Sequence, residues 1–130
     1  TANLALPHGF GLSATYALAF SEVKDQTSPA FGRALPFLPR HTGQVAVTYV
    51  SDANLKATLA ANYVGERYGD VTPRKLDDYW TLDAELTWEP FDKNIAFEAS
   101  AYNLLDEDFE VMPGFNGWGR VFKGMVKIRF

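Results

Sequence analysis

Hydrophobic and polar residues alternate with a period of two along most of the chain. In six stretches, large apolar residues at every second position are separated by Ser, Thr, Ala or charged residues. This pattern is typical of β-strands with two different faces, because successive side chains point to opposite sides of a sheet. The predicted strands cover residues 11–22, 41–50, 55–64, 79–88, 95–104 and 121–130. Residues 1–6 have the pattern of the end of a further strand, and no stretch shows a sustained helical period.

The segments between the predicted strands alternate in length. Short segments rich in turn-forming residues lie around His8, at 51–54 and at 90–94. The segments at 25–40, 65–75 and 106–120 are long. In an up-and-down antiparallel sheet, the short turns then gather at one end and the long loops at the other. Bacterial outer-membrane barrels have this arrangement, with tight periplasmic turns and long extracellular loops.

The alternation by itself leaves open which face is covered by protein and which by lipid. A lipocalin-like barrel turns its apolar face inward, whereas a membrane barrel turns it toward lipid. Trp80 and Trp88 favour lipid, since they share a face eight residues apart. That spacing corresponds to about 20 Å along the membrane normal, close to the separation of two aromatic girdles. The residues predicted to contact lipid are Leu12, Tyr16, Leu18, Trp80, Leu82, Leu86 and Trp88.

Composition and charge exclude several classes of protein. A chain of 130 residues has room for one domain at most. The net charge is −4, and no Lys- or Arg-rich run indicates a nucleic-acid partner. The chain has no cysteine, which excludes a disulfide framework and a thiolate metal site. No apolar window is long enough for a transmembrane helix.

No motif in the chain indicates catalysis or a bound cofactor. A nucleophile elbow and a phosphate-binding glycine loop are both absent. His8 and His41 lie far apart in the sequence, with no second ligand beside either. The acidic run at 106–110 lacks the spacing of a calcium-binding EF-hand loop. We therefore expect no enzymatic activity, no cofactor and no metal site.

Residues 102–130 resemble the C-terminal end of a TonB-dependent outer-membrane receptor. Members of that family close with an Asn-Leu-Phe/Leu-Asp element, a loop that carries Tyr or Phe, then Gly-Arg and a final strand that ends in Phe. The corresponding segments are "YNLLDEDFE" at 102–110 and "GWGRVFKGMVKIRF" at 117–130. The matching residues are Asn103, Leu104, Leu105, Asp106, Phe109, Gly119, Arg120 and Phe130. "LPFLPRHTGQVAVTYV" and "NYVGERYGD" resemble segments further upstream, so the resemblance covers nearly the whole chain.

The resemblance implies an all-β fold, an antiparallel up-and-down transmembrane β-barrel in the bacterial outer membrane. Such receptors have about 22 strands, an N-terminal plug domain and a box that engages TonB. Since this sequence has room for about six strands, we expect residues 1–130 to form the C-terminal part of a larger barrel, without the plug. The implied function is active uptake of a scarce ligand, first of all a ferric-siderophore, energised through TonB. Two alternatives stay open, a passive porin-like or adhesin-like barrel and a soluble lipocalin-like binder.

The resemblance also implies partners and candidate residues. The partners are outer-membrane lipid and lipopolysaccharide, TonB through the plug, the barrel assembly machinery through the final strand, and an iron-chelate ligand. Basic residues of the long loops attract an anionic chelate or lipopolysaccharide phosphates, or else pair with Glu66, Asp70, Asp77 and Asp78. The candidate ligand contacts are Arg33, Arg67, Tyr68, Arg74 and Trp118. A structural loop motif is expected from Asn103, Asp106, Gly119 and Arg120, in which Asp106 caps the turn and Arg120 holds the acidic loop.

The final stretch, 121–130, is predicted to act as a signal for assembly into the outer membrane. Its alternation places Phe122, Val126, Ile128 and Phe130 on the lipid face and the basic residues on the lumen. A terminal aromatic residue then lies at the periplasmic interface, where aromatic rings are enriched.

Deletion of Phe130 from the full-length receptor is expected to lower its outer-membrane level far more than Phe97→Ala does. The reason is that only the deletion removes the terminal residue that the assembly signal requires. Surface-exposed receptor per cell is measured at matched synthesis, with periplasmic aggregates counted separately. Equal outer-membrane levels for the two variants would reduce Phe130 to a packing residue.

Overall fold

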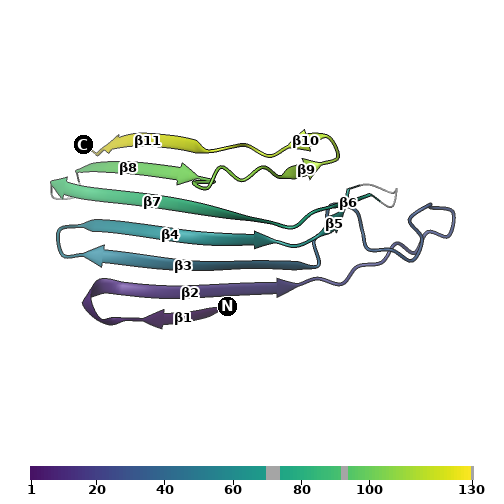
Figure 1. The fold of residues 1–130 in the computed structure, drawn as a ribbon. Coiled ribbons are helices and arrows are strands. Elements are labelled where there is room, and N and C mark those ends of the chain that lie inside the picture. The colour runs from purple at the N-terminus through teal and green to yellow at the C-terminus, as the bar shows by residue number, and fades with distance from the viewer. Residues whose placement is uncertain (70–73, 92–93, 130) are drawn as a thin grey trace.

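The computed structural model describes residues 1–69, 74–91 and 94–129, whose regular secondary structure is almost entirely β-strand (Figure 1). The predicted positions Asp70 and Phe130, and residues 92–93 of a predicted turn, lie outside this part. The strands are β1 (Ala2–Ala5), β2 (Phe10–Leu18), β3 (His41–Ser51), β4 (Leu55–Val64), β5 (Arg67–Tyr68), β6 (Lys75–Leu76), β7 (Tyr79–Phe91), β8 (Ile95–Tyr102), β9 (Glu110–Met112), β10 (Phe115–Asn116) and β11 (Val121–Ile128). No helix of the described part is long and apolar enough to cross a membrane.

Seven strands form a single antiparallel sheet in the order β1-β2-β3-β4-β7-β8-β11. Each strand pairs with its neighbour in the chain apart from the small strands of the loops, so the topology is up-and-down. The six long strands are those that the alternation predicts, and β1 is the further strand predicted within residues 1–6. The prediction of an all-β antiparallel sheet is confirmed. Two small ribbons, β5–β6 and β9–β10, lie in the long loops and were not predicted.

The ends of the strands differ from the prediction where a cross-strand partner is missing. The first long strand was predicted to reach residue 22, but β2 ends at Leu18. Leu18 pairs with His41, and one further backbone bond follows, from the N–H of Ala19 to the carbonyl of Arg40 over 2.9 Å. Phe20 would then come opposite Pro39, a residue that is found at the margins of sheets rather than within them. β8 ends at Tyr102, two residues early, because Asn103 adopts a left-handed φ of 50°. β7 is longer than predicted and continues to Phe91 through a register shift after Trp88.

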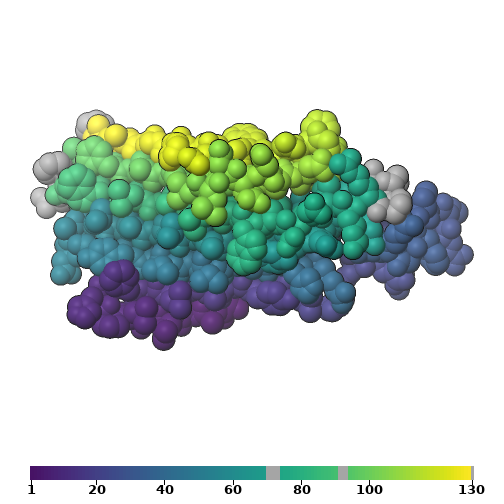
Figure 2. All heavy atoms as spheres, viewed as in Figure 1, coloured from purple at the N-terminus to yellow at the C-terminus, as the bar shows by residue number. Residues whose placement is uncertain are grey.

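The connections segregate to the two ends of the sheet, as predicted (Figure 1). The turn between β1 and β2 contains one turn of 3₁₀ helix, η1 (Pro7–Gly9), in which Gly9 has a φ of 80°. A Cβ at Gly9 would lie 2.1 Å from the carbonyl oxygen of Val50, so only glycine fits there. At the opposite end, the loops project beyond the sheet, and residues 19–40 reach furthest (Figure 2).

The pairing register places the predicted lipid-facing residues on one side of the sheet. Residues that pair across an antiparallel ladder share a face. One row across the middle of this face is Val47, Leu59, Ala84, Ala101 and Phe122, each paired with the next. The neighbouring rows continue the pattern, so the apolar face extends from β1 to β11.

Aromatic residues lie near both ends of this apolar face. At the loop end, the rings of Tyr63 and Trp80 are 4.7 Å apart. At the turn end, the rings of Trp88 and Phe97 are 5.9 Å apart, and Phe10 and Tyr49 are 4.8 Å apart. The two groups occupy the positions of the two aromatic girdles of a membrane barrel.

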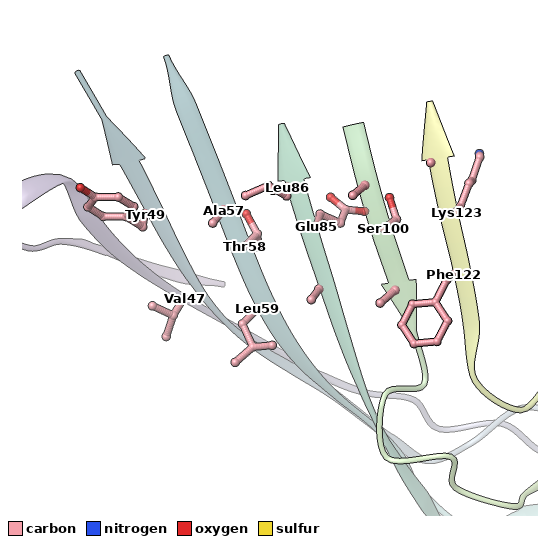
Figure 3. Close-up of a pocket in the computed structure, with 14 residues that line it drawn as sticks. Val47, Tyr49, Ala57, Thr58, Leu59, Glu85, Leu86, Ser100, Phe122 and Lys123 are labelled. Carbon is pink, nitrogen blue, oxygen red and sulfur yellow. The ribbon is translucent and has the colours of Figure 1, made fainter. Parts of the chain in front are cut away.

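A hollow of about 670 Å³ lies in the apolar face across β3, β4, β7, β8 and β11 (Figure 3). Its lining includes small residues, among them Ala84, Ala99 and Gly124, and larger apolar side chains such as Leu59 and Phe122. Because the face is the one assigned to lipid, this hollow suits acyl chains rather than a polar ligand.

The opposite face carries a chain of hydrogen bonds between polar side chains. Gln44 donates to Asn62 over 2.7 Å, and Asn62 donates to Asp83 over 2.9 Å and to Thr81 over 3.2 Å. Further along the sheet, Lys127 pairs with Glu98 at 2.6 Å. These bonds satisfy polar groups on the side that faces the lumen of a closed barrel.

An Arg at Leu82 is expected to destabilise the folded receptor by about 2–4 kcal/mol, and an Arg at neighbouring Thr81 by much less. Leu82 pairs with Ala61 on the apolar face, so its replacement places a charge in hydrocarbon, whereas Thr81 lies on the polar face. The free energy of unfolding is measured by denaturant titration in lipid bilayers. Equal destabilisation by the two substitutions would contradict the assignment of the faces.

Candidate functional site

The three long loops gather at one end of the sheet and are fastened to one another (Figure 1). The backbone N–H of Phe37, in the first loop, donates to the carbonyl of Tyr68, in the second, over 2.7 Å. Tyr79, the first residue of β7 after the second loop, stacks on Phe109 of the third loop with the ring centres 4.0 Å apart. The three loops therefore form one connected structure above the barrel wall.

Arg67 is the main link between the second and third loops. Arg67 is only 7% exposed, and its guanidinium donates to the carbonyls of Glu110 and Asp77. The same guanidinium lies 5.3 Å from the centre of the Tyr79 ring, within range of a cation–π interaction. Arg67 was predicted as a ligand contact, and the structure places its guanidinium among loop carbonyls.

Glu110 also receives the side chain of Arg74. The Nη2 atom of Arg74 lies 2.9 Å from both carboxylate oxygens of Glu110. Beside this pair, Lys75 Nζ donates to Glu66 over 3.1 Å, and this hydrogen bond raises the pKa of Lys75. The alternative expectation for these basic residues is that they pair with nearby carboxylates. Lys75 does so with Glu66, one of the expected partners, whereas Arg74 pairs with Glu110 of the third loop.

Asn103 holds the start of the third loop. It is 4% exposed, and its Nδ2 donates to the carbonyls of Glu107 and Trp118 over 3.0 and 3.2 Å. Its Oδ1 accepts from the N–H of Glu107 over 3.0 Å, and its own N–H donates to Asp83 over 2.9 Å. One amide thus connects both ends of the loop to the polar ladder of the wall.

Asp106 and Arg120 meet at the other end of the same loop. The bond that joins them is donated by the backbone N–H of Arg120 to Asp106 Oδ1 over 2.8 Å, while the guanidinium stays 4.0 Å away. A Cβ at Gly117 would lie 2.2 Å from the ring of Phe109, so glycine at that position lets the ring pack on the backbone. Gly119 lies against the same carboxylate, since a Cβ there would be 3.0 Å from Asp106 Oδ1, and the N–H of Asp106 donates to the carbonyl of Asn103 over 2.9 Å. The four residues of the expected structural motif, Asn103, Asp106, Gly119 and Arg120, are therefore close together.

A pocket of about 460 Å³ lies beside this loop on the polar face of the sheet. Tyr102 pairs with Val121 on that face, and Phe109 and Trp118 reach over it from the loop. Trp118 is 81% exposed, and Asp83 and Lys123 provide charges in the lining. In a closed barrel this pocket opens on the lumen at the end that carries the long loops.

The five predicted ligand contacts are not brought together. Trp118 lines the pocket on the polar face, and Arg33, Arg67 and Tyr68 line a different pocket. Arg74 lines neither of them and pairs with Glu110. The sequence analysis did not single out Tyr102, although this aromatic residue interrupts the alternation of its strand. That interruption is the signal that places a large ring on the polar face. Among the described residues, no group of His, Asp or Glu could hold a metal ion.

Replacement of Asn103 by Ala is expected to destabilise the third loop and lower the free energy of unfolding by about 2–4 kcal/mol. The change leaves buried loop groups without partners and puts alanine at a left-handed φ. Asn103→Gly tolerates the left-handed φ but lacks the side-chain amide. The difference in unfolding free energy between the Ala and Gly variants therefore measures the cost of the backbone conformation. Unfolding by denaturant and protease cleavage within 103–120 are measured. Asn116→Ala, an exposed position of the same loop, is the control, and an equal effect there would contradict the role of Asn103.

Comparison with known proteins places the chain in a family. A family model described as "TonB dependent receptor-like, beta-barrel" matches residues 1–104. A comparison with curated proteins gives no significant match.

Several solved receptors have the same fold over nearly the whole chain. The ferric yersiniabactin uptake receptor FyuA from Yersinia pestis is 25% identical, with a TM-score of 0.70, and the match covers 95% of this chain and 20% of the receptor. The siderophore receptor PiuA from Acinetobacter baumannii is 20% identical, with a TM-score of 0.72 and coverage of 95% and 20%. A variant of the ferric enterobactin receptor PfeA from Pseudomonas aeruginosa is 17% identical, with a TM-score of 0.78 and coverage of 98% and 21%.

The chain spans about a fifth of the length of these receptors. The family match over six of the seven strands of the main sheet confirms the resemblance read from the sequence and decides against a soluble lipocalin-like protein. The chain belongs to the TonB-dependent receptor β-barrel family, whose members are outer-membrane proteins of Gram-negative bacteria.

Proposed function

We propose that the chain is the C-terminal wall and loop region of a receptor that takes up a ferric-siderophore through the outer membrane. The observation that carries the proposal is the family match over residues 1–104, supported by solved neighbours that are ferric-chelate or siderophore receptors. The remaining strands, the plug and the box that contacts TonB belong to the rest of the receptor. TonB supplies the energy by pulling on the plug, and the barrel assembly machinery inserts the barrel through its final strand.

Within this proposal, the pocket on the polar face contributes to ligand binding. Trp118 presents a largely exposed ring at the lumen, and Tyr102 and Phe109 add aromatic surface beneath it. Aromatic rings bury much area at little conformational cost and suit the organic shell of an iron chelate. Of the five predicted contacts, Trp118 is the one whose position best supports a role in ligand binding.

The test measures binding and uptake of iron-55-labelled ferric siderophores by cells that carry the full-length receptor. Binding is expected to be saturable and independent of TonB, whereas uptake is expected to stop in cells without TonB. Non-saturable uptake that persists without TonB would favour the passive porin-like alternative. Trp118→Ala is expected to weaken ligand binding by about tenfold. Trp88→Ala, on the lipid face, is the matched control and should leave the affinity unchanged.

A further inference from the structure

The side-chain amide of Asn116 lies in the small ribbon β9–β10 of the third loop, beyond the ends of β8 and β11 (Figure 1). Asn116 is the last residue of β10, and it pairs with Glu110 across the ribbon. Its side chain is exposed, and the next residue is Gly117. The amide carbon of Asn116 is therefore accessible to water and is followed by a backbone nitrogen with no side chain beside it.

The residue that follows distinguishes Asn116 from the other asparagines of the chain. Each of the others precedes a larger residue, Leu, Tyr or Ile; they are Asn3, Asn54, Asn62, Asn94 and Asn103. A side chain at the next position hinders the approach of the backbone nitrogen to the amide carbon. Glycine removes this hindrance, because it has no Cβ and the widest backbone freedom. Asn54, exposed in the turn between β3 and β4, is the natural reference within the same chain.

We propose that Asn116 is a site of self-modification, at which the side-chain amide becomes a carboxylate through a cyclic imide with Gly117. The backbone nitrogen of Gly117 loses its proton to water and bonds to Cγ of Asn116. The bond between Cγ and Nδ2 breaks, and Nδ2 leaves as ammonia. A water molecule then opens the imide ring at one of its two carbonyls. The product is aspartate or isoaspartate, in which the chain runs through the former side chain, and the only co-reactant is water.

The closed third loop restrains this reaction. The N–H of Gly117 donates to the carbonyl of Phe109 over 2.7 Å, and the ring of the same phenylalanine packs against Gly117. A nitrogen held in this bond cannot turn toward the amide carbon of Asn116, so the reaction proceeds from conformations in which the loop opens locally. Asn103 keeps the loop closed, since its amide donates to the carbonyls of Glu107 and Trp118. The rate of conversion therefore depends on how often the loop opens.

The product places a new negative charge where the second and third loops are joined. Asn116 lines a small pocket of about 190 Å³ together with four carboxylates, those of Asp77, Asp78, Asp108 and Glu110. In the register of the ribbon, a carboxylate at position 116 comes directly opposite Glu110. Like charges opposite one another in an antiparallel pair are destabilising. Conversion is therefore expected to loosen the third loop, an effect that goes beyond the proposed function and does not depend on which ligand is transported.

The experiment follows conversion in the purified full-length receptor during incubation at neutral pH. Mass spectrometry of the loop peptides and enzymatic methylation of isoaspartate measure the product, and a sample digested without incubation corrects for conversion during digestion. Conversion is expected at Asn116 and not at Asn54. Asn103→Gly, which holds the loop less firmly, is expected to convert about tenfold faster than the wild type. No conversion at Asn116 in either protein would overturn the proposal, as would equal conversion at Asn54 or a rate that Asn103→Gly leaves unchanged.

A pair of variants at position 116 tests the effect of the new charge. Asn116→Asp carries the charge of the product, whereas Asn116→Gln stays neutral and would have to cyclise through a less favourable six-membered ring. Chymotrypsin is expected to cleave within 103–120 about two to five times faster in Asn116→Asp than in Asn116→Gln. High salt should reduce the difference, because it screens exposed charges. Equal cleavage of the two variants would contradict the loosening of the loop. Heat-modifiable migration confirms that each variant is folded, and neither assay uses a siderophore, so this inference and the proposed function can fail separately.

Discussion

A strand that crosses hydrocarbon has no water to satisfy its backbone, so every N–H and C=O must pair with a neighbouring strand. The long strands β2, β3, β4, β7 and β8 meet this requirement through ladders on both sides. Because the backbone groups are paired within the sheet, the side chains of one face can be apolar and contact lipid, while those of the other face can be polar and line the lumen. This explains why the described part has few buried apolar side chains, of which Leu76, in the loops, is the largest. The wall is one layer thick and separates two environments.

The polar face adds a second set of bonds that joins the wall to the loops. Asp83 is the connection, since it accepts from Asn62 within the sheet and from the N–H of Asn103 at the start of the third loop. A carboxylate on the lumen side is thus bonded on both sides of its strand. The consequence is that the loop above the lumen is oriented by the wall itself, so that Trp118 and Phe109 are presented over the pocket in a defined arrangement. Such preorganisation reduces the entropy lost when a ligand binds.

The features that could be predicted from the sequence are those with a local cause. Apolar and polar residues alternate with a period of two in each strand, so the strands, their two faces and the two aromatic groups can be predicted from the residues alone. The end of β2 could not be predicted in this way, because it depends on Pro39 coming opposite Phe20 in the pairing register. The structural loop motif was found through the family resemblance, but the bond between Asp106 and Arg120 uses the backbone of Arg120, which no residue type indicates. Arg67 was grouped with the exposed loop arginines, since its burial arises from contacts more than 40 residues away with Glu110.

Glu110 links the second and third loops so that each depends on residues of the other, which matters for receptor engineering. Its backbone carbonyl accepts from Arg67, its carboxylate accepts from Arg74, and the same carboxylate accepts from the N–H of Gly114. Two loops that are separate in the sequence are therefore one unit in their chemistry. A chimera that exchanged only the loop between β4 and β7 with that of a relative would leave the Glu110 loop without its two arginines. Grafting of specificity between receptors of this family would thus have to move both loops together, as a matched pair.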